Sequence, residues 1–556
     1  MSASSKKKLR KEQNAAALTE KQLAEQKESK KLKTYTISFV AVLALVVVAA
    51  LVVGLVTAYI NSGILQRSTN AVTIGDSTLT NADLNFFYMD QIKSDYNNWY
   101  NSYGDNMQLF VQWLYGLDIT KPLNQQVQDT ETGATFADYY KDMAIESARN
   151  VYAIYNLAKA AGETLTEAQE SELEVAIETL TLYASMYGYS DAEAYLHAMY
   201  GAGATIENYS KYLEAKTIAT NYAQKHYDSF EISDSEITAH NKENYDAFSF
   251  FDYSVFFVDV NAFLPCDAET VSSDHVHTED ELTTARKAAE EAAKALVASE
   301  AKTTEELNAA IAAYEAYKDN TSAKATNNTS YTLDKVSTVQ ANWLKAADRQ
   351  VGDLTMLTKE STTTDANGKE TTSIDGYYVM LFLGRNDNEQ KLVNVRHILT
   401  AFQGGTTDEN GNKVYTLAEK EGAKTVSEAI LSDWKAAGGT EEAFAALAKE
   451  KSTDVGSKEN GGLYESVLPG QMVDNFNDWC FAEDRKAGDY GIVETVHGSH
   501  LMYFVGHEDT TYRETMVEKA LRDEAYTAWY NTQLESVTAT ELNTEYLTLD
   551  YVIAGY

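Results

Sequence analysis

The sequence predicts a multidomain α+β protein that begins with a transmembrane helix. Three observations lead to this fold class: an uncharged apolar run near the N-terminus, helical periodicity that dominates to about residue 227, and later strands rich in aromatic and β-branched residues. Because 556 residues are too many for one hydrophobic core, we expect three or more domains.

The apolar run Ile37–Ala58 predicts the transmembrane helix, which we place at residues 34–60. The run contains no charged residue and is long enough for a bilayer core of about 30 Å. Residues 1–33 hold ten of the 46 Lys and Arg but only four of the 83 Asp and Glu, which favours a cytoplasmic tail. A cleaved signal peptide is the alternative, but its apolar part is normally about 7–15 residues long. We therefore expect an uncleaved anchor.

The rest of the chain is strongly acidic. The net charge of −37 combines a basic tail with an acidic body, which argues against nucleic-acid binding by the body. Solubility is the simplest explanation of this acidity. The two cysteines, Cys266 and Cys480, allow one disulfide in principle, but nothing in the sequence pairs them.

Residues 61–250 are predicted to form a helical domain. Val72–Ile74 is typical of a short strand, and Thr80–Asp83 is a capping-box start for the first long helix. Aromatic residues are dense between Tyr96 and Tyr115. Core packing is the simpler explanation for them, and ligand binding is the alternative.

An internal repeat covers the next part of the chain. The segment Trp343–Asp353 matches Trp479–Asp489 in its Trp, Ala, Asp, Arg, Gly and Asp residues, and Gly376–Gly384 matches Gly498–Gly506. Residues 251–387 are therefore predicted to be a divergent copy of residues 391–507.

The first copy is predicted to be inert. In the alignment of the repeat, Phe257 stands at the position of His397, and Tyr378 stands at the position of His500. The first copy has no counterpart of Asp454. Whatever chemistry the second copy performs, we expect the first to provide only its fold.

The second copy is predicted to alternate strands and helices. The expected elements are a strand over Leu392–Thr400, helices over 416–437, 440–449 and Val473–Lys486, and a hairpin over Ile492–Thr495 and Ser499–Gly506. After this copy, Thr511–Leu534 is expected to be helical and Tyr546–Ile553 to be a strand.

Short motifs between Val393 and Phe504 recur in one order. They are Val395-Arg396-His397-Ile398-Leu399, Ser452-Thr453-Asp454 followed by Gly461-Gly462, Gly470-Gln471-Met472 with Phe476, Thr495, and Gly498-Ser499-His500. In this order the chain resembles the parvulin family of peptidyl-prolyl isomerases. From about residue 70 to the end it is similar to the PrsA/SurA class of extracytoplasmic foldases, specifically in the parvulin part and loosely in the helical part.

The resemblance implies a domain plan. It predicts a SurA-N/PrsA-like chaperone domain over 61–250, a degenerate parvulin-like domain over 251–387 and a parvulin isomerase domain over 388–508. Residues 509–556 would supply a C-terminal helix and strand that pack on the helical domain.

The resemblance also implies an active site. Rotation about a prolyl bond faces a barrier of about 18–20 kcal/mol, and an enzyme lowers it by binding the twisted imide better than either planar form. The implied polar floor consists of His397, Asp454, Thr495 and His500. The implied substrate-binding socket consists of Tyr464, Met472 and Phe476. The i, i+4 spacing of Met472 and Phe476 predicts that both lie on one helix face.

Two departures from the family pattern affect the substrate. Tyr464 stands where the family has an apolar wall residue, so we expect a socket of different size. The loop 401–410 is acidic where phosphate-specific parvulins are basic, which disfavours a phosphorylated substrate. No cofactor or metal is expected. His275 and His277 are the one other candidate metal site, but no third histidine lies near them.

The expected function is that of a membrane-anchored peptidyl-prolyl isomerase and foldase. Its body would lie outside the cytoplasmic membrane and act on unfolded or newly secreted polypeptides that contain X-Pro bonds. The alternative is a non-catalytic holdase chaperone whose helical domain binds unfolded chains. The sequence indicates no oligomeric state and no nucleic-acid partner.

Overall fold

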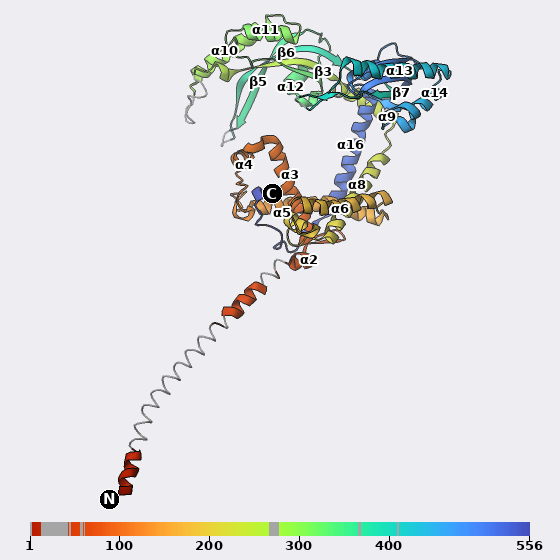
Figure 1. The fold of residues 1–556 in the computed structure, drawn as a ribbon. Helices are drawn as coiled ribbons and strands as arrows, with labels where there is room; N and C mark the ends of the chain where they lie inside the picture. The colour runs from red at the N-terminus through yellow and green to blue at the C-terminus, as the bar shows by residue number, and fades with distance from the viewer. Residues whose placement is uncertain are drawn as a thin grey trace. The chain divides into compact units, whose positions relative to one another are not determined.

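The computed structural model describes residues 3–12, 43, 46–55, 59, 62–265, 277–364, 368–408 and 411–555. The chain divides into two compact units, Met1–Phe230 with Ala525–Tyr556 and Glu231–Glu524 (Figure 1). Helices and strands occur in both units, which agrees with the predicted multidomain α+β class.

Most of the predicted tail 1–33 and transmembrane helix 34–60 lies outside the described residues, as does the loop that contains Cys266 and His275. Within the described ranges, no helix combines the length and the apolar character needed to cross a membrane.

Helices make up most of the first unit. They are α2 Ile64–Ser68, α3 Asn81–Tyr103, α4 Met107–Tyr115, α5 Phe136–Ala160, α6 Glu167–Met186, α7 Ala192–Tyr200 and α8 Ile206–Ser229. The predicted capping box is confirmed: the Thr80 amide donates to Asp83 Oδ2 at 2.9 Å, and the Asp83 amide donates to Thr80 Oγ1 at 3.3 Å. These bonds satisfy amides that have no partner within the first turn of α3.

A small sheet joins the two ends of this unit. It consists of β1 Asn70–Ile74, β2 Ser77–Thr80 and β13 Ala539–Glu541, in the order β13-β1-β2. The predicted strand over Tyr546–Ile553 is wrong. Its backbone instead makes local turn bonds, such as the Leu547 amide to the Thr544 carbonyl at 3.2 Å, and its apolar residues Leu547 and Ile553 enter the helical core from these turns.

The second unit contains two antiparallel four-stranded sheets with the same strand order. The first has the order β4-β3-β6-β5, with β3 Phe250–Asp259, β4 Thr326–Tyr331, β5 Leu354–Thr364 and β6 Glu370–Asn386. The second has the order β10-β7-β12-β11, with β7 Lys391–Ala401, β10 Leu463–Val467, β11 Tyr490–Glu494 and β12 Gly498–Thr511. A hairpin of β8 Thr406–Thr407 and β9 Lys413–Val414 follows β7.

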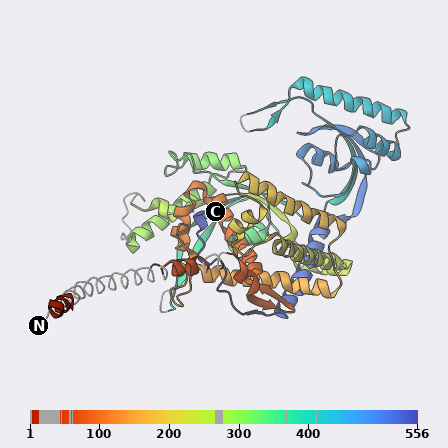
Figure 2. The same ribbon diagram turned by 60° about the horizontal axis from the view of Figure 1, so that its bottom comes forward.

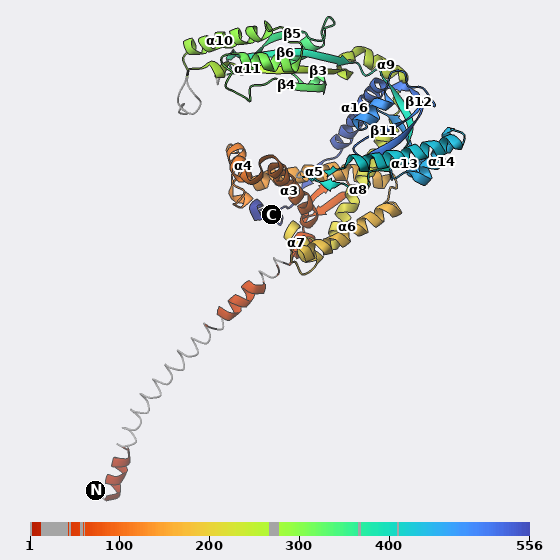
Figure 3. The same ribbon diagram turned by 45° about the horizontal axis from the view of Figure 1, so that its top comes forward.

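Helices cover both sheets in the same way. In the first copy, α10 Glu279–Val297 and α11 Thr304–Ala313 lie against one face (Figure 3), and α12 Thr338–Leu344 packs against the other (Figure 1). In the second copy, α13 Leu417–Ala436 and α14 Glu441–Lys451 take the first role (Figure 2), and α15 Asp474–Cys480 takes the second. The unit begins with α9 Asp234–Glu243, and α16 Tyr512–Glu535 follows β12.

Helix α15 is shorter than the predicted Val473–Lys486. It ends at Cys480, and the Arg485 guanidinium turns back to donate from Nε to the Trp479 carbonyl at 2.9 Å. The first copy has the same device, in which Arg349 Nε donates to the Trp343 carbonyl at 3.1 Å. Each arginine also lies over the ring of its tryptophan. The repeated Trp and Arg residues therefore close a short helix in both copies.

Strand register corrects one detail of the repeat. Phe257 was placed at the position of His397, and Tyr378 at that of His500. In the first sheet Tyr378 pairs with Phe257, whereas in the second His500 pairs with Leu399. Phe257 therefore corresponds to Leu399. The predicted alignment was wrong by two residues. A shift of two residues keeps every side chain on the same face of the sheet, so the pattern of apolar and polar residues does not reveal it.

Val255 consequently has the place of His397 in the first sheet. An aliphatic side chain and the Tyr378 phenol ring, which lies 5.2 Å from the ring of Phe257, stand where the second copy has two imidazoles. A histidine pair cannot form there. That the first copy is inert stays a prediction.

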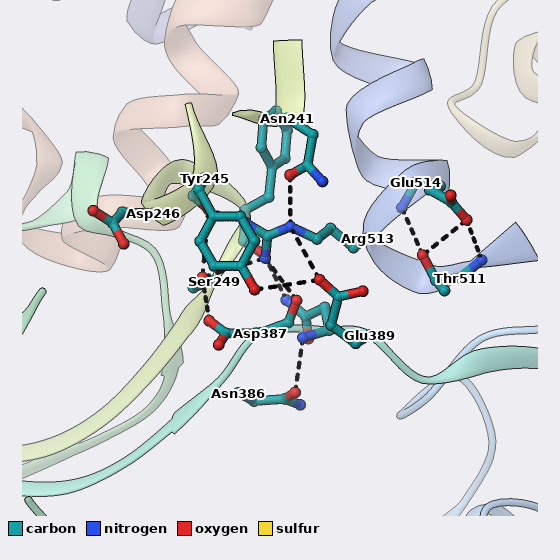
Figure 4. A network of polar contacts seen from close by, with 12 residues as sticks. Asn241, Tyr245, Asp246, Ser249, Asn386, Asp387, Glu389, Thr511, Arg513 and Glu514 are labelled. Carbon is teal, nitrogen blue, oxygen red and sulfur yellow. Dashed lines mark hydrogen bonds and ion pairs between the residues drawn. The ribbon is translucent and has the colours of Figure 1, made fainter. Parts of the chain in front are cut away.

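A buried arginine links the segments that meet between the two sheets (Figure 4). Arg513, at the start of α16, is fully buried. Its Nε donates to Asn241 Oδ1 of α9 at 2.7 Å, and its Nη1 donates to the carbonyl of Asp387, in the connection from β6 to β7, at 2.6 Å. Its guanidinium carbon lies 3.6 Å from the ring centroid of Tyr245. These contacts satisfy a cation that would otherwise be costly to bury.

Candidate active site

Two histidines meet on one face of the second sheet. His397 lies on β7 and His500 on the neighbouring strand β12, in a diagonal position, because His500 pairs directly with Leu399. Their Nδ1 atoms are 3.0 Å apart, and both side chains are almost fully buried. Phe476 of α15 places its ring edge-on to both imidazoles, with centroid distances of 5.4 Å.

Polar partners extend the imidazole pair at each end. Thr495 Oγ1, just after β11, lies 2.9 Å from His500 Nε2. Asp454 Oδ2, in the loop after α14, lies 3.0 Å from His397 Nε2. The structure thus brings His397, Asp454, Thr495 and His500 together in one chain of hydrogen bonds.

Ser457 also belongs to this chain of hydrogen bonds, although sequence reasoning missed it. Its hydroxyl donates to Asp454 Oδ2, its amide donates to the same oxygen at 3.1 Å, and its Oγ lies 2.9 Å from His397 Nε2. The signal was present in the sequence, because a serine three residues after an aspartate is typical of a side-chain-stabilised turn.

The hydrogen bonds select one tautomer for each histidine. An ionised Asp454 can only accept, so His397 Nε2 carries the proton and donates to it. His397 Nδ1 is then an acceptor, and His500 Nδ1 must donate to it. His500 Nε2 in turn accepts from the Thr495 hydroxyl, whose oxygen accepts from the His497 amide at 3.1 Å. Every donor in the chain therefore points toward Asp454.

The pKa values agree with neutral imidazoles beside an ionised carboxylate. Burial lowers the pKa of His397, although Asp454 opposes this effect. Burial and the neighbouring His397 and His497 lower the pKa of His500 to about 3. For Asp454, burial alone would raise the pKa, but the hydrogen bond from Ser457, the neighbouring His397 and the hydrogen bond from Tyr464 outweigh it and lower the pKa to about 2.

A cavity of about 480 Å³ opens above this chain. It is lined by His397, Leu399, Ala401, Asp454, Tyr464, Gln471, Met472, Val473, Phe476, His497 and His500. All three predicted socket residues border it, but Met472 is not on the helix with Phe476, because α15 begins only at Asp474. The expected i, i+4 pair was therefore wrong, and Met472 reaches the cavity from the turn before the helix.

Tyr464 has a polar role as well as a wall position. Its hydroxyl donates to Asp454 Oδ2 at 3.0 Å, and its ring stacks on His397 with centroids 5.0 Å apart. The sequence predicted only a change in socket size at this position. Because β10 pairs with β7, Tyr464 is held beside His397, and its hydroxyl adds a further donor to the carboxylate.

The arrangement can bind a ring over a fixed polar floor. Buried aromatic groups provide a dry wall, and neutral imidazoles in set tautomers provide oriented dipoles. Asp454 Oδ2 already accepts from Ser457, Tyr464 and His397, so it is poorly suited to attack a substrate. A reaction that needs preferential binding of a twisted bond, with no bond made or cut, suits this geometry. Fold and site together define a parvulin-type domain.

Comparisons with known proteins agree with this class. Residues 377–506 match the family described as the PPIC-type PPIASE domain. Foldase protein PrsA 1 of Listeria monocytogenes serotype 4b (strain F2365) is 32% identical over 103 residues, which cover 17% of this chain and 35% of the relative. Foldase protein PrsA 2 of the same strain is 33% identical over 110 residues, covering 20% and 29%. The chain thus spans about a third of the length of these curated relatives.

Solved structures of similar proteins include two PrsA proteins. PrsA from Bacillus anthracis is 24% identical, with coverage of 27% of this chain and 59% of that chain and a TM-score of 0.17. PrsA from Bacillus subtilis is 14% identical, with coverage of 72% and 85% and a TM-score of 0.24. Both TM-scores are below 0.5.

The predicted resemblance is confirmed. This chain carries a parvulin-type peptidyl-prolyl isomerase domain and is similar to PrsA foldases. The family match begins at Tyr377, within β6, and ends at Gly506, within β12, so it includes part of β6 of the first sheet and most of the second sheet.

Proposed function

We infer that this protein is a membrane-anchored extracytoplasmic peptidyl-prolyl isomerase that assists the folding of secreted polypeptides. The observation that carries the proposal is the buried chain from Thr495 through His500 and His397 to Asp454, at the floor of an aromatic cavity. The basic tail before an uncharged run of membrane-spanning length supports the location.

The roles of the site residues follow from their positions. Tyr464, Met472 and Phe476 would enclose the proline ring, because they border the cavity with apolar surface. His397 and His500 would lie beneath the imide, with Thr495 and Asp454 holding their tautomers. Since every imidazole proton is already donated within the series of hydrogen bonds from Thr495 to Asp454, the histidines would act through fixed dipoles and shape rather than by proton transfer.

Isomerase activity is tested on the full chain in detergent micelles. The rate of cis-to-trans conversion of a Leu-Pro tetrapeptide is measured for the wild type and for His500→Ala. We expect acceleration by the wild type and at least a tenfold loss in the variant, or about 1.4 kcal/mol of transition-state binding. A folded wild type that gives no acceleration would refute the catalytic proposal.

A non-catalytic holdase is the second candidate, and helix α4 favours it. Five large apolar side chains on this nine-residue helix are exposed: Leu109, Phe110, Trp113, Leu114 and Tyr115. Only Met107 and Val111 of α4 are buried. Exposed apolar side chains gathered on one element mark surfaces that bind other chains.

Aggregation of a chemically unfolded client separates the two candidates. If holding is the main activity, Trp113→Ser should weaken suppression of aggregation, while His500→Ala should leave it intact. If isomerisation is the main activity, His500→Ala should slow refolding of a client limited by a prolyl bond, and Trp113→Ser should not change the tetrapeptide rate.

A further inference from the structure

A second hollow adjoins the cavity of the proposed isomerase site. Its volume is about 390 Å³, and it is lined by Lys420, Val473, Asp474, Asn475, Glu494, Thr495 and Val496. Val473 borders both the hollow and the cavity. Thr495 lines the hollow and is also bonded to His500, which lines the cavity. An extended chain with its proline in the cavity would therefore present a neighbouring side chain to the hollow.

The hollow has an excess of negative charge. Of its two carboxylates, Glu494 is paired with Lys420 at 2.8 Å. Asp474 is exposed, and no cation among the described residues forms an ion pair with it. The two uncharged polar residues add no charge: Thr495 is bonded to His500, and Asn475 donates from Nδ2 to the Glu494 carbonyl at 2.8 Å. The hollow thus carries about one uncompensated negative charge.

Apolar walls accompany this charge. Val473 and Val496 both line the hollow, and Val496 is 74% exposed. An exposed valine gains from being covered by a hydrocarbon chain. Lysine and arginine provide this combination, because their stems cover apolar surface while their heads stay in contact with water and with carboxylates. An acidic or phosphorylated side chain would be repelled by the negative charge of the hollow.

We propose that this hollow is a specificity subsite that receives a lysine or arginine side chain next to the substrate proline. The proposal deepens the isomerase function and rests on it. The charged residues that line the hollow are Asp474, Glu494 and Lys420. Asp474 is the principal attractive group, and Lys420 limits the attraction by neutralising Glu494.

The test compares tetrapeptides that differ only beside the proline. Peptides with Lys, Leu or Glu before the proline, and a second set with these residues after it, are assayed with the full chain in micelles. We expect kcat/KM to be highest for a lysyl peptide and lowest for the matching glutamyl peptide. Asp474→Asn should lower the lysyl-to-leucyl ratio by roughly two- to fivefold, the range expected for an exposed ion pair.

A matched control separates the subsite from the general acidity of the body. Asp484→Asn removes the same charge from an exposed position in the same domain, outside the lining of the hollow. It should leave the lysyl-to-leucyl ratio within error of the wild type. Lys420→Met should change the ratio in the opposite direction from Asp474→Asn, because it frees Glu494. High salt should reduce the changes in the lysyl-to-leucyl ratio that Asp474→Asn and Lys420→Met cause.

The outcomes distinguish the subsite from the underlying function. If no peptide is isomerised, the proposed function fails. If all peptides are isomerised but the wild type shows no preference for lysine, the subsite proposal is overturned. The same holds if Asp474→Asn and Asp484→Asn change the ratio equally, because the preference then comes from overall charge.

Discussion

Replacement of Asp454 by asparagine is the sharpest perturbation of the candidate site. Asparagine has nearly the same shape, so no cavity is opened. The change removes the charged acceptor for His397 Nε2, which lies 3.0 Å from Asp454 Oδ2. It also removes the constraint that fixes the tautomer of each histidine, because an asparagine amide can donate as well as accept.

The magnitude follows from the second acceptor in the structure. Ser457 Oγ lies 2.9 Å from the same imidazole nitrogen and can accept its proton in place of Asp454. A hydrogen bond to a charged group contributes about 1.5–3 kcal/mol, and a neutral one about 0.5–1.5 kcal/mol. The difference is about 1–2 kcal/mol, or roughly a five- to thirtyfold loss in kcat/KM. Replacing both side chains by alanine, Asp454→Ala with Ser457→Ala, leaves a buried N–H without a partner and should cost about 1–3 kcal/mol more.

The assay measures isomerisation of a Leu-Pro tetrapeptide by the full chain in micelles. Asp454→Asn, Asp454→Ala, Ser457→Ala and the double variant Asp454→Ala/Ser457→Ala are compared, with Asp484→Asn as the control for loss of one exposed carboxylate. Circular dichroism and thermal melting show whether each variant stays folded. We expect the double variant to lose more than the sum of the two single losses, because each acceptor substitutes for the other.

Strict additivity of the two changes would contradict the shared-acceptor argument. Full activity of the folded double variant would refute the catalytic assignment of the whole chain of hydrogen bonds. In that case the holdase proposal would account better for the protein.

Four further predictions concern pH, packing, the socket and topology. Because His500 has a depressed pKa in the folded state, its stabilising contribution is complete above pH 6.5 and is lost as pH falls toward 3. The free energy of unfolding in urea should therefore fall by about 3 kcal/mol from pH 7 to pH 4, and this fall should be smaller in His500→Gln. Arg513→Ala should lower the free energy of unfolding by about 3–5 kcal/mol by chemical denaturation, and Arg522→Ala, in a partly exposed helix pair, by less than about 1 kcal/mol; equal losses would contradict the network. Met472→Ala should raise KM by up to roughly tenfold with little change in kcat, since it removes about 1.5 kcal/mol of socket surface. Protease added to intact, wall-stripped cells should digest the body and leave residues 1–33; a protected body would rule out the proposed topology.

Local patterns in the sequence were sufficient for many elements of the fold. The Thr80–Asp83 capping box, the helices that became α13 and α14, and the hairpin of β11 and β12 all follow from periodicity and cap residues. Such features depend on residues within about one or two turns of each other. The order of the motifs was also enough to predict the parvulin class.

Helical and strand periodicity failed where a side-chain contact outside the pattern decides the outcome. Helix α15 ends at Cys480 because Arg485 returns to the Trp479 carbonyl, and the periodicity of the helix contains no sign of this. Residues 546–553 look like a strand, yet they turn so that Leu547 and Ile553 can enter the helical core. In the first case a side chain six residues further along ends the helix, and in the second case tertiary contacts override the local preference of the chain.

Residue order along the chain was enough to identify most members of the site, though not Ser457, whereas the interactions among them depend on the tertiary fold. His397, Asp454, Thr495 and His500 were identifiable from their order along the chain. Their tautomers and the depressed pKa of each histidine became apparent only when strands β7 and β12 placed the imidazoles 3.0 Å apart in a buried position. Proton positions and charge depend on burial and on partners that are many residues away, and a linear pattern does not contain either quantity.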